Sequence, residues 1–178
     1  AGQPLLDVEA KGLASRRKAI EQILQILSLQ ARSLDTVIAS NGDISAMANF
    51  PDVPAVDDPA LANTLATARN QTLQIKAQLK QLDTRLSSMR ESLRLQTRIA
   101  DDYKPLFETG AMARNAYLTQ LNKVQELKAQ FSTLEEEKVR VIGVASTQLN
   151  QINRQRIDLE SELVNLKETI GYRTILAP

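Results

Sequence analysis

The chain has 178 residues, and only 3% of them are aromatic, with no Trp. It carries 22 Lys and Arg against 21 Asp and Glu, so a net charge of +1 gives no reason to expect nucleic acid, which requires a basic excess or a basic face. His and Cys are absent, which excludes zinc sites built on them, thiol nucleophiles and His general bases; we expect no enzyme, no catalytic residue, no metal and no cofactor.

The first predicted helix spans about residues 9–40, where a wide apolar stripe suits a helix that packs against two neighbours. Asn41 and Gly42 are predicted to end it, because both residues tolerate the left-handed conformation at a helix C-terminus. Residues 41–58 follow as a long acidic loop, which we interpret as a crossover connection. The stripe includes Leu13, Ile20, Leu24, Leu27, Ala31, Leu34 and Ile38.

The second predicted helix spans about residues 59–107, with Asp58 as its N-cap and Pro59 in its first turn. Apolar residues then alternate spacings of four and three over about six heptads, a period that specifies a left-handed coiled coil. This seam consists of Leu61, Leu65, Ala68, Thr72, Ile75, Leu79, Leu82, Leu86, Met89, Leu93, Gln96, Ala100 and Tyr103.

Pro105 and Gly110 predict a tight turn at about residues 108–113. Proline disfavours the α conformation at Lys104, and glycine takes the positive φ that ends a helix. Helices joined by so short a turn must be antiparallel neighbours.

The third predicted helix spans about residues 113–170, with Gly143 as a soft spot and Gly171 at its end. Its seam frame weakens around residues 128–138, where charged side chains occupy it. A shifted frame through Leu127, Leu134 and Val141 is the alternative. The unshifted seam is Tyr117, Leu121, Val124, Phe131, Ile142, Ala145, Leu149, Ile152, Leu159, Leu163, Leu166 and Ile170, with Lys128, Glu135, Lys138 and Arg156 at the remaining positions.

The predicted fold is therefore all-α: a long antiparallel coiled-coil hairpin with a third, shorter helix at its base. Residues 1–8 and 172–178 are expected to form short strand-like ends. The base would be three helices thick and the tip only two.

Three charged groups stand out from this pattern. We interpret the acidic run at residues 135–137 as a solvated helix face. The basic run at residues 16–18 is an exposed helix face or a contact with lipid or a neighbouring subunit. Asp101 and Asp102 lie beside the turn, where they either offset local positive charge or contact a partner.

Three segments together resemble the membrane fusion proteins, or periplasmic adaptors, of the haemolysin-secretion (HlyD) type. Residues 2–8 are similar to the Gly-Gln/Asp-x-Leu-Leu segment of that family, and residues 172–178 to its Ile-Arg-Ala-Pro strand, with Leu176 in place of the usual basic residue. Residues 106–115 resemble the family's segment at the hairpin tip.

The resemblance implies that residues 1–8 and 172–178 are remnants of a lipoyl-like β domain that carries no lipoate. It also implies a periplasmic protein, anchored to the inner membrane through a segment absent from this chain. Its partners would be an inner-membrane ABC exporter and a TolC-type outer-membrane channel in type I secretion. The hairpins would form a homo-oligomer, a hexamer. A tripartite drug-efflux adaptor is the alternative.

Efflux adaptors of this family carry Arg-x3-Leu-x6-Ser at the tip. Leu106 matches the Leu of this motif, whereas Asp102 replaces the Arg and Ala113 replaces the Ser. By this resemblance Arg114 and Asn115 would take over hydrogen bonding at the helix N-terminus. The predicted channel-contacting residues are Asp102, Leu106, Gly110, Ala113, Arg114 and Asn115.

Two other classes of protein remain open from the residues alone. A self-assembling coiled-coil scaffold would continue the seam past both ends of the chain. A helical bundle that only tethers or holds other proteins would lack the flanking β domain that the adaptor hypothesis predicts.

Overall fold

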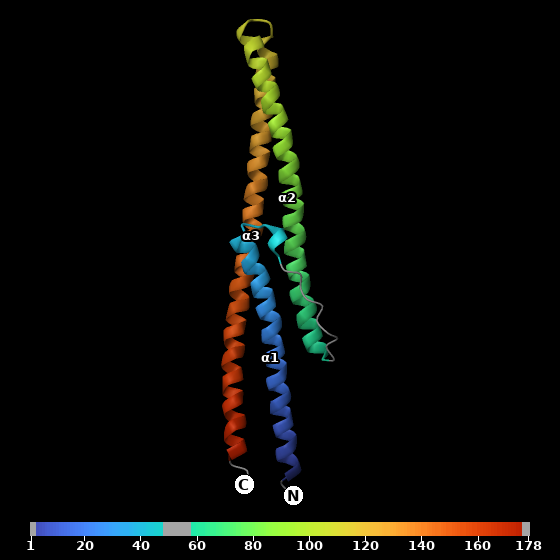
Figure 1. The fold of residues 1–178 in the computed structure, drawn as a ribbon, viewed down its shortest axis with the longest axis vertical. Coiled ribbons are helices and arrows are strands. Elements are labelled where there is room, and N and C mark those ends of the chain that lie inside the picture. The colour runs from blue at the N-terminus through green and yellow to red at the C-terminus, as the bar shows by residue number, and fades with distance from the viewer. Residues whose placement is uncertain (1–2, 48–57, 176–178) are drawn as a thin grey trace. The chain divides into compact units, whose positions relative to one another are not determined.

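The computed structural model describes residues 3–47 and 58–175, and its regular structure is helical throughout these ranges (Figure 1). Helix α1 is Gln3–Ala39, α2 is Pro59–Glu108 and α3 is Arg114–Ile175, and a single 3-10 turn, η1, covers Ile44–Ala46. The all-α prediction is confirmed. Within the described ranges, no helical segment combines the length and apolar character that crossing a membrane requires.

The predicted strand-like ends are wrong wherever the structure describes them. Residues 3–8 belong to α1 and residues 172–175 belong to α3, which continues past Gly171. A strand needs a second strand to satisfy its N–H and C=O groups, whereas a helix satisfies them within its own segment. The rest of the predicted ends, residues 1–2 and 176–178, lies outside the described residues.

The end of α1 is a Schellman motif at the predicted residues. Asn41 has φ 53° and Gly42 has φ 81°. The Gly42 N–H donates to the Val37 carbonyl at 2.7 Å, and the Asn41 N–H donates to the Ile38 carbonyl at 3.2 Å. The predicted loop continues to residue 58, but its residues 48–57 lie outside the described part of the chain.

The start of α2 is also as predicted. The Asp58 carboxylate accepts a hydrogen bond from the Ala60 N–H at 2.9 Å, and the Asp58 carbonyl accepts one from the Ala62 N–H at the same distance. Pro59 occupies the first helical position, where its missing N–H costs nothing.

The chain divides into two compact units: a first unit of residues 1–75 and 144–178, and a second unit of residues 76–143. In the first unit α1 packs against α2 through an apolar cluster of Ile23, Ile26, Leu61, Leu65 and Ala68. On α3 of the same unit, the Glu162 carboxylate forms an ion pair with Arg16 of α1. Helix α1 therefore contacts both α2 and α3, as its wide apolar stripe predicts.

A buried polar pair crosses the same unit. Gln30 of α1 is only 2% exposed, and its Nε2 donates to Oε1 of Gln71 on α2 at 3.0 Å. Displacing the partner of a buried amide costs more free energy than displacing an apolar contact. This bond therefore favours one register of α1 against α2.

The second unit is a two-helix antiparallel hairpin. Gln120, early in α3, donates to Gln96 Oε1, late in α2, at 2.8 Å. Lys138, further along α3, contacts Asp83, further back on α2, at 2.8 Å. The predicted seam faces inward in this unit, with Leu79 fully buried and Leu82 and Leu86 nearly so.

The structure decides between the two α3 frames that the sequence leaves open. Val141 is 6% exposed and Leu127 and Leu134 are half-buried, whereas Lys128 and Glu135 are exposed. The shifted frame therefore forms the interface between residues 127 and 141.

Gly143 lies inside α3 without interrupting it, and a Cβ built there meets nothing within 4 Å. We expect Gly143→Ala to raise the free energy of unfolding by about 0.5–1 kcal/mol, because alanine loses less backbone entropy in a helix. Chemical denaturation measures the change. Gly110→Ala is the matched control: its φ of 73° disfavours a Cβ, so the same substitution should destabilise the protein by about 1–2 kcal/mol. A destabilising Gly143→Ala contradicts an unstrained helix at this position.

Candidate functional site at the hairpin turn

The turn of the second unit is built around Gly110. Helix α2 ends at Glu108, and the Gly110 N–H then donates to the Phe107 carbonyl at 3.0 Å. The Met112 N–H donates to the Leu106 carbonyl at 3.1 Å, so the chain folds back over the last turn of α2 before α3 begins. The positive φ at Gly110 makes this reversal possible without a steric cost.

Pro105 lies inside α2, so the expected departure from helix at Lys104 does not occur. The loss of helix stability is small here, because the proline removes one backbone hydrogen bond and lies within two turns of the helix end. One turn later, the N–H and the Oγ1 of Thr109 both donate to the Pro105 carbonyl, at 3.0 and 2.9 Å. These two bonds stabilise the last turn of α2 after the proline.

An aromatic stack joins the two helices next to the turn. The rings of Phe107 and Tyr117 are 5.0 Å apart between centroids and 15° from parallel. The heptad pattern predicts Tyr117 in the seam but does not indicate Phe107 as its partner. The available signal was their position on either side of Gly110, before and after a short reversal. The stack holds the first turn of α3 against the last turn of α2.

The predicted contact residues all lie in this unit and are exposed. Leu106 is 45% exposed, although it adjoins the half-buried Phe107. Asp102 lies one turn before Leu106 on the same side of α2. Arg114 and Asn115 open α3 on the other side of the turn. The structure thus brings the predicted residues to one end of the hairpin, yet in the described part of the chain no side chain of these residues is joined to another of them by a hydrogen bond or an ion pair.

Ala113 stands at the N-cap position of α3. Its carbonyl accepts from the Ala116 and Tyr117 N–H groups at 3.0 and 3.4 Å, but its side chain has no acceptor for the first N–H groups of the helix. The first turn of α3 contains no acidic residue either. The helix therefore begins uncapped at the turn, with its N–H groups available to solvent or a partner.

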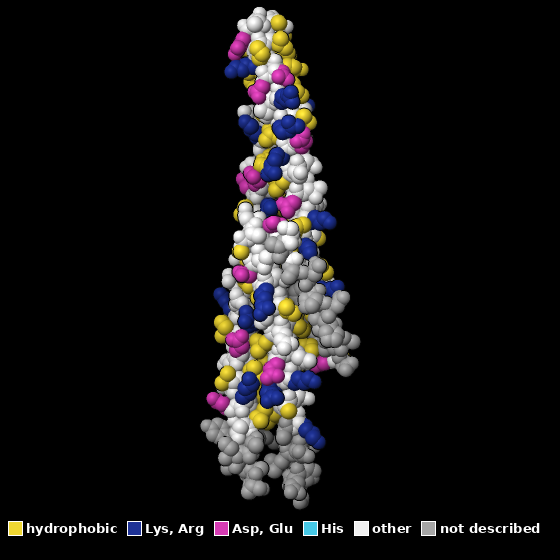
Figure 2. Space-filling model, in the orientation of Figure 1, with side chains coloured by type: hydrophobic (Ala, Val, Ile, Leu, Met, Phe, Trp, Pro, Cys, Tyr) yellow, Lys and Arg dark blue, Asp and Glu magenta, His cyan; other side chains and the backbone are white. Residues whose placement is uncertain are grey.

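The electrostatics near the turn are those of an exposed surface. On the face drawn in Figure 2, hydrophobic side chains are interspersed with charges of both signs. Further back on α2, about four turns before its end, Arg94 donates two hydrogen bonds to Glu91, and these hold the pKa of the Glu91 carboxyl below its ordinary value. No group of three or more acidic side chains among the described residues is arranged to hold a metal ion. What this arrangement offers is a contact surface with an apolar centre at Leu106.

The fold and the turn define a class of protein: an antiparallel α-helical hairpin with long helices and a tight reversal at Gly110. The family model described as CyaD, alpha-helical hairpin domain, matches residues 10–162. The chain belongs to this family, whose members are HlyD-like membrane fusion proteins. These proteins are periplasmic, membrane-anchored adaptors. No curated protein and no solved structure matches the chain.

The missing cap gives a direct test of how α3 begins. We expect Ala113→Ser to raise the free energy of unfolding by about 0.5–2 kcal/mol, because the new hydroxyl accepts from the uncapped N–H groups. Thermal unfolding followed by circular dichroism measures the shift. Ala116→Ser, three residues into the helix, is the control and should give no gain, since serine is a weaker helix former than alanine there. Equal effects of the two variants would place the start of α3 elsewhere.

Proposed function

We propose that the chain is the helical hairpin of an adaptor for type I secretion, which links an inner-membrane ABC exporter to a TolC-type outer-membrane channel. The observation that carries the proposal is the exposed Leu106 at a turn ordered by Gly110 and by the Phe107–Tyr117 stack. An exposed large apolar side chain at an ordered turn favours burial in a partner.

Leu106 supplies the affinity in this proposal, and its polar neighbours supply orientation. Burying one leucine side chain contributes about 1.5–3 kcal/mol, which is roughly a tenfold to hundredfold change in binding. Asp102 provides a negative charge one turn away, and Arg114 with Asn115 provides donors beside the uncapped N-terminus of α3. Charges of both signs around an apolar centre select a partner with the complementary pattern.

Two residues favour secretion over the alternative of drug efflux. Asp102 reverses the charge of the Arg that the efflux motif has at this position, and Ala113 removes the hydroxyl of its Ser. Each change removes a polar contact that an efflux channel partner would otherwise satisfy. In this proposal, the channel partner therefore makes different polar contacts at Asp102 and at Ala113.

The proposal extends to the whole protein. In it, the hairpin is periplasmic, the protein is held at the inner membrane by a segment absent from this chain, and six copies form the conduit. In this proposal, residues 1–8 and 172–178 adjoin a lipoyl-like β domain. The conduit guides a substrate and catalyses no reaction.

The sharpest test is Leu106→Asp in the full-length protein. It places a charge at the apolar centre, so we expect channel binding to fall by at least about tenfold and export to be lost, while the helical circular dichroism stays unchanged. Leu95→Asp is the matched control, because Leu95 is 46% exposed on the same helix, three turns before the tip, and Leu106 is 45% exposed. It should leave both binding and export intact.

Full export by the Leu106→Asp protein would overturn the proposed contact. Equal losses in the two variants would point to a general effect of charge on the hairpin and would also contradict a contact centred on the turn.

A further inference from the structure

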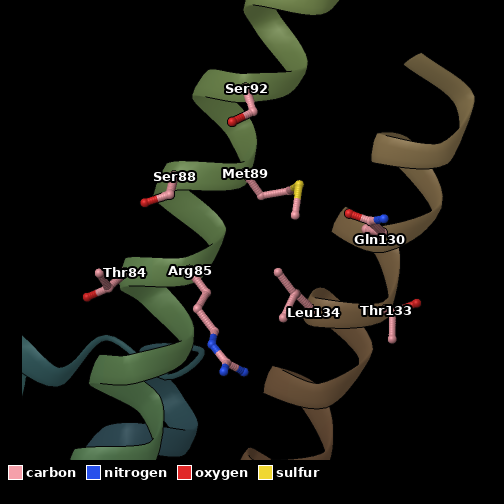
Figure 3. A pocket seen from close by; sticks show the side chains of 8 residues that line it. All are labelled: Thr84, Arg85, Ser88, Met89, Ser92, Gln130, Thr133 and Leu134. Carbon is pink, nitrogen blue, oxygen red and sulfur yellow. The ribbon is translucent and has the colours of Figure 1, made fainter. Parts of the chain in front are cut away.

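Away from the turn, an open groove of about 550 Å³ lies between α2 and α3 of the second unit. Met89 and Leu134 point toward one another across it, and Arg85 projects into the same space (Figure 3). The other side chains of its lining carry hydroxyl or amide groups, and none of these groups reacts without a partner. A different kind of chemistry is available at the end of α1, in the first unit.

Asn41 is the only asparagine of the chain that precedes a glycine. A side-chain amide at this position is open to attack by the next backbone nitrogen, because glycine has no Cβ to hinder the approach. Each of the other asparagines precedes a residue with a side chain. Asn41 is also exposed, so water has access to its amide.

The reaction needs no reagent other than water. The Gly42 nitrogen loses its proton and attacks Cγ of Asn41, which forms a new C–N bond. The bond between Cγ and Nδ2 breaks, and the leaving nitrogen takes up the proton that Gly42 lost, so ammonia departs. Water then opens the resulting succinimide at either of its two carbonyls and gives aspartate or isoaspartate. In isoaspartate the main chain runs through the side chain and is one carbon longer.

The Schellman motif at the end of α1 keeps this nitrogen from reacting. The Gly42 N–H donates to the Val37 carbonyl at 2.7 Å, and Gly42 itself is buried. The nitrogen can lose its proton and approach Cγ only after this hydrogen bond breaks. The reaction therefore proceeds from a locally open form, and its rate is proportional to the population of that form.

Conversion at Asn41 weakens the motif that restrained it. The longer main chain of isoaspartate moves the Gly42 N–H away from the Val37 carbonyl. The new carboxylate also lies at the C-terminal end of α1, where the helix macrodipole is negative. The last turn of α1 contains no basic residue that would offset this charge, and Asp43 adds another carboxylate two residues later. The product therefore holds the end of α1 less firmly than Asn41 does.

We propose that Asn41 is a site of spontaneous deamidation and isomerisation, in which the Gly42 nitrogen is the nucleophile and the Schellman motif of α1 sets the rate. Its effect is a slow, one-way loosening of the end of α1 in a chain that is otherwise intact. The site lies in the first unit and is independent of the proposed contact at the turn.

The test follows the full chain in mildly alkaline heavy-oxygen water, folded and in urea, by mass spectrometry of its peptides. We expect aspartate and isoaspartate at Asn41, each with oxygen from the water. Asn63 and Asn150 are internal controls and should keep their amides over the same period. The folded chain should react at least about tenfold more slowly than the chain in urea, which corresponds to an opening free energy of about 1.4 kcal/mol.

Several outcomes would contradict this chemistry. An unreacted Asn41 in urea would overturn the site, and so would aspartate without isoaspartate, because direct hydrolysis of the amide does not involve Gly42. Gly42→Ala should slow the conversion in urea, where the backbone strain of the folded state is absent, because its methyl group hinders the attack. An unchanged rate would exclude the Gly42 nitrogen as the nucleophile. Equal rates in the folded and the unfolded chain would overturn control by the Schellman motif.

Two buried valines separate local opening from global unfolding. Val37→Ala, beside the motif, should speed the conversion of the folded chain by up to about tenfold, because it removes buried carbons that hold the last turns of α1. Val124→Ala is the matched control: Val124 is 5% exposed in the second unit, so its loss should leave the rate at Asn41 unchanged. Equal acceleration by the two variants, or acceleration by neither, would contradict a reaction that depends on local opening at α1.

Hydrogen exchange of the separated isoaspartate form tests the effect on the fold. We expect the Gly42 amide to exchange faster than in the unconverted chain, because its hydrogen bond to the Val37 carbonyl is lost. Asn41→Asp is the control, since it adds the charge without lengthening the main chain, and it should speed exchange less. Protection at Gly42 equal to that of the unconverted chain would overturn the proposed loosening of α1.

Discussion

The narrow apolar seam between α2 and α3 is the constraint on which the rest of the second unit depends. Leu79, Leu82 and Leu86 are buried at alternating spacings of three and four, and their helix presents charges and hydroxyls elsewhere. A two-helix seam buries only one stripe of each helix, so it leaves most side chains in water and encloses no large interior cavity. The large apolar side chains that this unit leaves exposed include Leu106 near the turn and Val139 on the outer surface of α3.

Polar contacts between the helices fix the register of one helix against another, which leucine packing alone does not fix. Leucine packing tolerates a shift of one heptad, because the same residue types meet again after seven positions. The Gln120–Gln96 bond, the Lys138–Asp83 pair and the Gln30–Gln71 bond do not repeat after such a shift. Each would leave a polar group without its partner in a part-buried place, so each favours the observed alignment. A fixed register is what brings Phe107 to Tyr117 and sets the turn.

Much of this fold follows from local signals in the sequence. The unbroken seam of α2, the caps at Asn41 and Asp58 and the reversal at Gly110 depend on the chemistry of a few neighbouring residues, and the structure has them as predicted. The heptad frame of α3 could not be predicted in this way. Lys128 fits one heptad repeat and Leu127 fits an overlapping one, and only packing against α2 selects the second. The strand-like ends failed because strand formation depends on partner strands, whereas α1 and α3 extend through these residues on their own hydrogen bonds. The predicted site residues do gather at one turn, but the Phe107–Tyr117 stack that orders it is a tertiary contact with no periodic signature.

The central claim is that residues 76–143 fold back on themselves at Gly110 and so present Leu106 at a turn. A double electron–electron resonance distance between spin labels at Leu95→Cys and Lys123→Cys tests it most directly. Both positions are exposed, and they lie on the two different helices of the hairpin, α2 and α3. Helices packed at about 8–10 Å between axes predict a label separation below about 25 Å. A separation of roughly 40 Å, the length of one continuous helix between these positions, would contradict the hairpin and with it the proposed contact at the turn.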